Sequence, residues 1–200
     1  PMIGASAAAC AQNLRSSSFT GSFSSGWTFA STGVAPNGTS AYFDSNFIPS
    51  SNVTLSSFAF SAYSRTVNGA AYKLWGIANF SGADGNSKSY LNSRLVGIDN
   101  SNNSTAVDAS VTFLTDLGLR MSNRNSISEY KLSQNTTTAP TITQTANKLA
   151  TINFYFGGSN GDFLSYCQQE IAFANLGDGL TDTQASDFYN SVQTFNQTLD

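Results

Sequence analysis

The sequence contains no histidine among its 200 residues. Without histidine, neither a Ser-His-Asp nor a Cys-His catalytic arrangement can form, and histidine-based zinc sites are excluded as well. The two cysteines cannot complete a structural zinc site by themselves. The glycine-rich residues 157–161 follow an expected strand, but they lack the lysine and the helix of a phosphate-binding loop. The commonest nucleophilic, zinc and nucleotide-binding chemistries are therefore not expected.

Charged residues are also scarce, with nine Lys and Arg against twelve Asp and Glu and a net charge of −3. No basic patch is evident, which argues against a nucleic-acid partner. No apolar run reaches the roughly 18 residues that a membrane span needs, so we expect no membrane span. The chain opens with Pro1-Met2-Ile3, without the charged n-region of a signal peptide, and we expect it to be cut from a longer polypeptide.

Acidic residues are too few and too scattered for the usual hydrolytic machinery of a sugar-cleaving enzyme. Glycoside hydrolysis needs two carboxylates roughly 5–9 Å apart across the scissile bond. The only glutamates, Glu129 and Glu170, each stand alone on an expected strand. No acidic pair occupies alternating positions of a strand. We therefore expect a protein that is not an enzyme, with a sandwich-fold glycoside hydrolase as a distant alternative.

Two loops carry oxygen ligands for calcium, but each offers a single carboxylate. They are Asp84-Gly85-Asn86 and residues 99–103, which begin with Asp99. Calcium needs several oxygens, usually from more than one carboxylate. Plain turns are the preferred interpretation, so we expect no metal-ligating residues and no cofactor. Calcium is the single cofactor that stays open.

The chain has two cysteines, Cys10 and Cys167, which we expect to be neighbours in space because a first and a late strand commonly adjoin in a sandwich. The preferred interpretation is a pair of buried free thiols. The alternative is a disulfide between them. By loop-closure entropy such a bridge would add roughly 4–5 kcal/mol to the stability.

Aromatic residues are abundant, with 15 Phe, 8 Tyr and 2 Trp in a background of Ser, Thr and Asn. Turn signals such as Pro36-Asn37-Gly38 and Asn68-Gly69 separate roughly ten to twelve short strand-like runs, the pattern of a β-sandwich or barrel. We expect one domain over residues 1–200. The clearest expected strands are residues 40–43, 53–65 with a bulge near Ser56-Ser57, 72–80, 89–98, 107–115, 117–122, 127–132, 149–156 and 171–176. The Thr-rich residues 136–145 fit either a loop or an edge strand.

One segment near the end of the chain has a helical period, and it predicts a single long helix over residues 182–198. Thr181 is the expected N-cap, and Gln184 three residues later completes a capping box. The apolar positions lie one helical turn apart along a single face: Ala185, Phe188, Tyr189, Val192, Phe195 and Leu199. We expect Phe188, Val192 and Phe195 to be buried against the sheets.

Several segments resemble a known family. They are PMIGASAAACAQNL, GWTFASTGVAPNGTSAYFDSNFIPSSNVTLSSFAFSAYSRT, GLRMSNRNSISEYKLSQN, INFYFGG and IAFANLGDGLTDTQASDFYNSVQTF. Together they are similar to the concanavalin A-like (laminin G-like) jelly-roll domain of bacteriophage tail and other virion structural proteins. The resemblance implies an all-β, antiparallel two-sheet jelly-roll sandwich with one C-terminal α-helix, closing a longer polypeptide of a virion. It implies no ligand and no catalytic residues.

A virion surface module suggests recognition of a host glycan or another receptor. Carbohydrate binding uses flat aromatic side chains next to planar hydrogen-bonding groups. The candidate ligand-binding residues combine a flat apolar body with a polar end: Trp75, Tyr90, Arg94, Arg124 and Tyr130. For each of them, packing in the core or on a strand is the competing interpretation. The competing function is a purely structural or decoration module that assembles with other virion proteins. In either case we expect a multimeric display.

Overall fold

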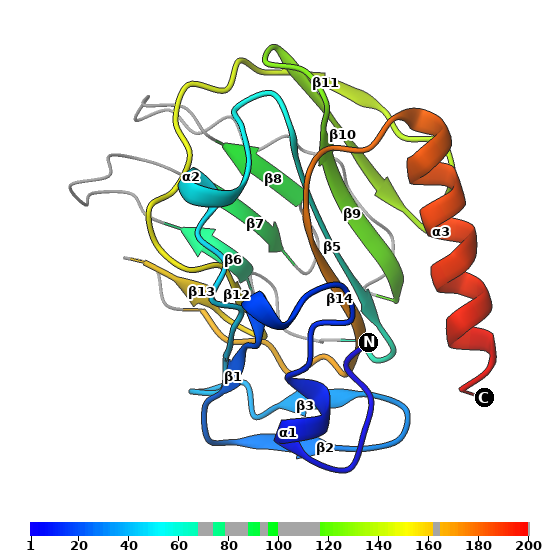
Figure 1. Cartoon of the computed structure of the whole chain (residues 1–200). Helices are drawn as coiled ribbons and strands as arrows, with labels where there is room; N and C mark the ends of the chain where they lie inside the picture. The colour runs from blue at the N-terminus through cyan, green and yellow to red at the C-terminus, as the bar shows by residue number, and fades with distance from the viewer. Residues whose placement is uncertain (68–73, 79–87, 93–95, 100–116, 162–164, 200) are drawn as a thin grey trace.

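A computed structural model describes residues 1–67, 74–78, 88–92, 96–99, 117–161 and 165–199 of the chain. These residues form two β-sheets and a long C-terminal helix (Figure 1). We name the sheets A and B. Sheet A has the strand order β1 (Ser22–Phe23), β4 (Phe43–Asp44), β12 (Tyr155–Phe156), β6 (Leu74–Ala78), β7 (Lys88–Asn92) and β8 (Val96–Asp99), and β13 (Ser159–Asn160) also pairs with β6.

Sheet B has the strand order β11 (Thr141–Thr143), β10 (Glu129–Gln134), β9 (Gly118–Arg124), β5 (Phe58–Ser64), β14 (Ile171–Gly177), β3 (Val34–Pro36) and β2 (Trp27–Phe29). Among the described strands, β13 and β6 form the one parallel pair. The helical elements are α1 (Ala7–Cys10), the 3-10 turn η1 (Ser17–Phe19), α2 (Pro49–Asn52) and α3 (Asp182–Gln197). The expected β architecture, with two largely antiparallel sheets and a C-terminal helix, is therefore confirmed.

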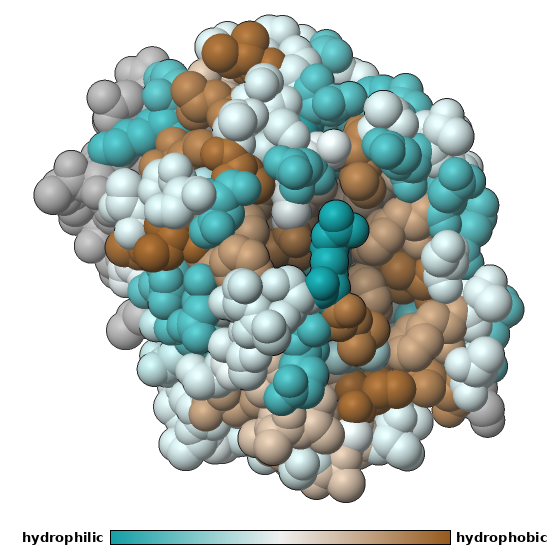
Figure 2. Space-filling model, in the orientation of Figure 1, coloured by the Kyte–Doolittle hydropathy of each residue, from teal (hydrophilic) through white to brown (hydrophobic). Residues whose placement is uncertain are grey.

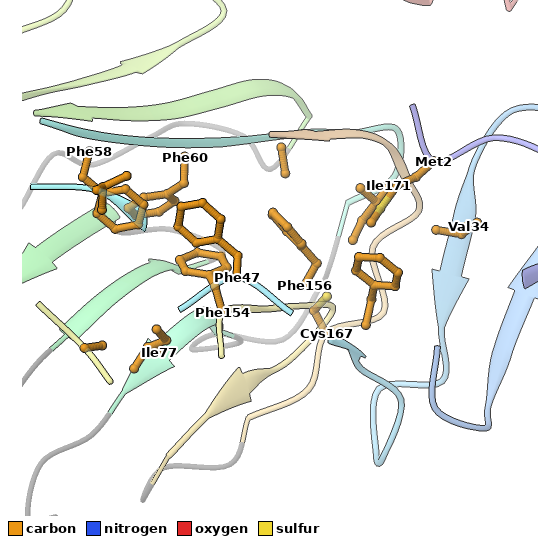
Figure 3. Close-up of a cluster of buried hydrophobic side chains, with 14 of the residues drawn as sticks. Met2, Val34, Phe47, Phe58, Phe60, Ile77, Phe154, Phe156, Cys167 and Ile171 are labelled. Atoms are coloured by element: carbon orange, nitrogen blue, oxygen red, sulfur yellow. The ribbon is translucent and has the colours of Figure 1, made fainter. Parts of the chain in front are cut away.

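The two sheets share one aromatic core. Phe58 and Phe60 extend from β5 toward Phe154, which lies on the opposite side of the core (Figure 3). The ring centroid of Phe154 lies 5.1 Å from that of Phe60 and 5.3 Å from that of Phe156 on β12. Ile77 on β6 is fully buried in the same cluster. Because both sheets contribute to one cluster, they stack as two layers.

Strand β9 is buried along its whole length, on both faces of sheet B. Its pairing with β5 places Arg124 opposite Phe58 and Ser122 opposite Phe60, so these side chains share the inner face. The alternate residues Met121 and Asn123 lie on the outer face, where α3 packs (Figure 1). Sheet B is thus enclosed between the shared core and the helix.

Helix α3 begins as the sequence predicts. The side chain of Thr181 accepts a hydrogen bond from the N–H of Gln184, and the Gln184 side chain accepts one from the N–H of Thr181. Val192 is buried, which confirms one expectation. Phe188 and Phe195 are only half-buried, so their expected full burial is wrong.

The aromatic side chain of Phe173 on sheet B packs against this face of the helix. The ring of Phe173 on β14 lies 5.8 Å from that of Phe188 and 6.3 Å from that of Phe195. The helix therefore lies across the surface of the sheet, and its opposite side faces solvent. Figure 2 shows pale and teal, hydrophilic side chains along the margin where α3 lies in Figure 1.

Several expected strands have different bounds in the structure. Residues 89–98 form two antiparallel strands, β7 and β8, rather than one. Residues 53–57 form a turn closed by a bridge from Thr54 to Ser57, in place of the expected bulge. Of residues 149–156 only Tyr155 and Phe156 form a strand, and Phe154 before them is buried in the core. The expected strand at 107–115 lies outside the described residues.

In the Thr-rich segment, Thr141–Thr143 form β11, the last strand of sheet B, and the residues on either side of it are loop, so each alternative holds in part. Both cysteines are free thiols, and both are buried in the shared core cluster. The disulfide alternative is therefore not realised, and the preferred interpretation of two free thiols is confirmed.

Candidate functional site

Two of the expected ligand-binding residues, Arg124 and Tyr130, are buried rather than exposed. Their relative exposures are 0% and 1%. The Arg124 Nη1 donates hydrogen bonds of 3.0–3.2 Å to four backbone carbonyl oxygens, those of Ser126, Ile127, Glu129 and Gln144. Its guanidinium carbon lies 5.1 Å from the centre of the Tyr130 ring. Both residues therefore brace the loops at the end of β9, and their assignment to a ligand-binding surface is corrected.

The other three candidates fall on or beside sheet A. Trp75 lies on β6, where it pairs with Leu91 of β7, and Tyr90 on β7 pairs directly with Gly76 of β6. Arg94 lies outside the described residues.

The outer face of sheet A carries a stacked pair of tyrosines that sequence reasoning missed. Tyr155 on β12 alternates with the buried Phe156, and Tyr42 precedes the buried Phe43 of β4. The two tyrosine rings stack with their centroids 4.5 Å apart and an angle of 8° between their planes. Both side chains are half-buried, so part of each remains accessible. We call this surface, with the residues described next, the tyrosine face.

A third tyrosine joins the pair over a glycine. Gly158 forms a bridge with Tyr166, and a Cβ built on Gly158 would lie 3.0 Å from Cδ1 of Tyr166 and 3.4 Å from Cβ of Tyr42. A larger residue at this position would push against both tyrosines. The absence of a side chain at Gly158 thus lets Tyr42 and Tyr166 approach each other on the tyrosine face.

A fixed carboxylate lies beside the stacked rings. Asp44 pairs directly with Tyr155 across β4 and β12, so their side chains lie on the same face. The Asp44 Oδ1 accepts a hydrogen bond from the N–H of Asn46 at 2.8 Å, and Oδ2 accepts one from Nδ2 of Asn153 at 3.0 Å. Asn160 in turn donates to the carbonyl oxygen of Asn153 at 2.9 Å. This network holds the carboxylate in one orientation.

The hydroxyl of Tyr155 is held in its neutral form. Burial raises its pKa first, followed by the charge of Asp44 and by the charge and hydrogen bond of Tyr42, with a further contribution from Tyr166, to about 12. The hydroxyl is protonated at neutral pH, as in an ordinary tyrosine, and the raised pKa extends the pH range over which it keeps its proton. The tyrosine face thus offers aromatic surface, hydroxyl donors and a carboxylate acceptor within a few strands.

One row of cross-strand partners extends the face across sheet A. Tyr155 lies opposite Gly76, and Gly76 lies opposite Tyr90. Two strand spacings separate Tyr155 from Tyr90, which amounts to about 10 Å. Gly76 has a φ of 121°, a backbone conformation that favours glycine. The register therefore places two tyrosine positions on either side of a strand position without a side chain.

A pattern in the sequence does mark this site. The dipeptide Tyr-Phe forms β12 at residues 155–156 and leads into β4 at residues 42–43. Because successive residues of a strand face opposite ways, two adjacent aromatics in a sandwich strand place one in the core and one outside. The partner of each outward tyrosine, however, comes from a distant part of the chain. No local signal predicts which outward aromatics meet.

A second surface lies between α3 and sheet B. Two hollows of about 190 and 250 Å³ share Asn123, Lys131 and Asp182 in their linings. The ion pair from Lys131 Nζ to Asp182 Oδ1, 2.6 Å long, lies between them and ties the start of α3 to β10. The linings contain no stacked aromatic pair, so the tyrosine face is the stronger candidate.

Among the residues the structure describes, no three His, Cys, Asp or Glu side chains cluster as metal ligands. The calcium candidates at 84–86 and 100–103 lie outside these residues, and Asp99 ends β8. Within the same residues no helix combines the length and apolarity needed to cross a membrane. No protein-family model and no curated protein matches the sequence.

Proposed function

We propose that the chain is a non-catalytic carbohydrate-binding module whose ligand lies on the tyrosine face. The observation that carries this proposal is the stacked Tyr42–Tyr155 pair, accessible on an outer face and next to a fixed carboxylate at Asp44. Sugars present a C–H face that packs on aromatic rings and hydroxyl groups that hydrogen-bond to carboxylates and amides. The tyrosine face supplies both kinds of contact.

The shape of the site favours weak recognition strengthened by repetition. Half-buried tyrosines on a sheet surface cover one side of a ligand and leave the rest in water, and contacts of this kind are often completed by bridging water. We expect a dissociation constant of about 1 mM for a single domain, equivalent to roughly 4 kcal/mol of binding free energy. Display of several copies raises the apparent affinity by orders of magnitude.

The sequence resemblance supports the biological setting of this proposal. It favours a concanavalin A-like jelly-roll topology for the two sheets and a place on the surface of a phage virion. In that setting the partners are a host cell-surface glycan and neighbouring virion proteins, and the module has no catalytic role. The alternative is a decoration module that contributes only to assembly. The glycan-binding proposal and this alternative differ in whether the tyrosine face contacts sugar.

Binding by a multivalent form of the domain tests the proposal. The domain is biotinylated, assembled on streptavidin and applied to a glycan array. We expect selective glycan binding, and we expect Tyr42→Ala with Tyr155→Ala to reduce it at least tenfold. Tyr189→Ala, which changes a half-buried tyrosine on α3, is the matched control and should leave binding unchanged.

A second measurement covers the case in which the double variant does not fold. Titration of the unmodified protein with the strongest array ligand should change tyrosine fluorescence, because the ligand covers the stacked rings. Absence of any glycan binding by the unmodified multivalent protein would leave the decoration module as the better interpretation. If Tyr189→Ala reduces glycan binding as much as the Tyr42 and Tyr155 double variant does, the binding site is not the tyrosine face.

A further inference from the structure

We propose that the tyrosine face selects neutral glycans that present two adjacent hydroxyl groups, and that it rejects sugars carrying carboxylate, phosphate or sulfate groups. This inference rests on the proposed carbohydrate binding and adds the chemical class of the ligand. It follows from how the Asp44 carboxylate is held and from the charge of the groups around it.

The Asp44 carboxylate has acceptor capacity left over after its contacts are counted. A carboxylate offers about four acceptor positions, two on each oxygen. In the part of the chain that the structure describes, the N–H of Asn46 uses one position on Oδ1 and Nδ2 of Asn153 uses one on Oδ2. One position on each oxygen remains. Two neighbouring acceptors on one rigid carboxylate match the two donors of a vicinal diol.

The two contacts that Asp44 makes also fix its orientation. Asn46 lies two residues away in the same turn, and Asn153 is itself held by Nδ2 of Asn160. A carboxylate already held in place loses little further freedom when a ligand binds, which favours affinity and geometric selectivity. The site therefore distinguishes sugars by the spacing of their hydroxyl groups.

The electrostatic character of the face opposes anions. The charge of Asp44 helps, after burial, to raise the pKa of Tyr155, which shows that a second negative charge beside it is disfavoured. The groups that form the face carry no positive charge: Tyr42, Asp44, Asn153, Tyr155, Asn160 and Tyr166. The chain as a whole has a net charge of −3. Because these groups include no cation, an anionic sugar bound against them would meet the charge of Asp44, and like charges brought together reduce affinity.

Matched neutral and anionic polymers test this selectivity. The multivalent protein is titrated with soluble β-glucan, mannan and galactan, each before and after oxidation of its primary hydroxyls to carboxylates. We expect at least one neutral polymer to bind and its oxidised form to bind at least tenfold more weakly. We also expect the difference in affinity between the neutral and the oxidised polymer to become smaller at high salt, because screening weakens the electrostatic repulsion.

Replacement of the carboxylate separates its role from that of overall charge. Asp44→Asn should weaken binding of the neutral polymer about tenfold, since an amide replaces one acceptor oxygen with a donor. It should also reduce the ratio of the affinity for the neutral polymer to the affinity for its oxidised form. Asp187→Asn, at an exposed position of α3, changes the net charge by the same amount and should leave the ratio unaltered.

The outcomes distinguish this inference from the proposed function. Equal binding of the neutral and oxidised polymers, lost in the Tyr42 and Tyr155 double variant, would keep carbohydrate binding and overturn the selectivity. The same change of ratio in Asp187→Asn as in Asp44→Asn would overturn the role of Asp44. Binding of no polymer in either form would overturn both proposals.

Discussion

The outer faces of the two sheets differ in how their aromatic residues are used. On sheet B, Phe173 packs against Phe188 and Phe195 of α3, so its aromatic surface contributes to holding the helix. On sheet A, Tyr42 and Tyr155 stack on each other and remain half-exposed. The same in-and-out alternation of strand residues thus produces a face that holds a helix on one sheet and the face proposed for recognition on the other. Substitutions should separate these roles.

The largest expected effect concerns the buried Arg124 of sheet B. Replacing it by alanine removes its hydrogen bonds to four backbone carbonyls and its packing on Tyr130. Because buried acceptors that lose their donors are costly, we expect a loss of about 3–5 kcal/mol in the free energy of unfolding. Denaturant titration measures this loss. Arg15→Ala, at an exposed arginine, is the control and should change stability by less than about 0.5 kcal/mol.

The comparison of the two faces becomes sharper when one outward aromatic is removed from each. Phe173→Ala should cost about 2–3 kcal/mol, because a half-buried ring that contacts two helix rings is lost. Tyr155→Ala should cost about 1–2 kcal/mol, mostly the stacking with Tyr42, while abolishing glycan binding. Thermal and denaturant unfolding of both variants provide the measurement. A larger loss of stability for Tyr155 than for Phe173 would contradict the division of roles.

A smaller effect is expected at the start of α3, the element that makes sheet B different from sheet A. Thr181→Ala removes the side chain that caps the N–H of Gln184, and such caps contribute about 1 kcal/mol. Thr183→Ala, two residues further on in the first turn of the helix and exposed, keeps the cap and is the control. Equal stability of the two variants would show that the cap adds nothing to the docked helix.

The smallest expected effect on the free energy of unfolding concerns Tyr155 of sheet A and occurs only at alkaline pH. The pKa of Tyr155 is raised to about 12, above the value near 10 of an unfolded tyrosine. Its contribution to stability is therefore complete below pH 10 and is lost as the pH rises through about 12. Tyr155→Phe should make the unfolding free energy fall less steeply across this window and remove one late-ionising tyrosine from the absorbance titration at 295 nm. Loss of a tyrosine that ionises near pH 10 instead would show that Tyr155 ionises normally.

The elements that the sequence predicts well are those specified by neighbouring residues. The capping box at Thr181 and the helical period that follows are both local, and α3 begins and ends within one residue of the predicted bounds. Strand β14 is bounded by a glycine turn and agrees equally well. By contrast, residues 149–156 carry strand-like composition, but only Tyr155 and Phe156 form a strand. Which residues find a partner strand depends on distant parts of the chain, and composition does not encode that pairing.

The sequence names Tyr90 as a candidate binding residue, and the structure pairs it with Gly76, but the sequence analysis does not include Tyr42 or Tyr155 among the candidates. Residue type cannot distinguish an outward Arg124 from one enclosed by four carbonyls, because burial depends on which strands flank it. The hydrogen bond from Asn153 to Asp44 spans 109 positions, so the site is assembled by pairing of distant strands.

This assembly from distant segments has a consequence during biosynthesis. The tyrosine face needs Tyr42 and Asp44 from the first quarter of the chain together with Tyr155 and Tyr166 from the last. Until the segment that contains Tyr166 has left the ribosome, the residues of the tyrosine face cannot all come into contact, and the face does not form. If the proposed sugar binding is correct, it requires both ends of this segment pair, around Tyr42 and around Tyr166, to be synthesised and folded together.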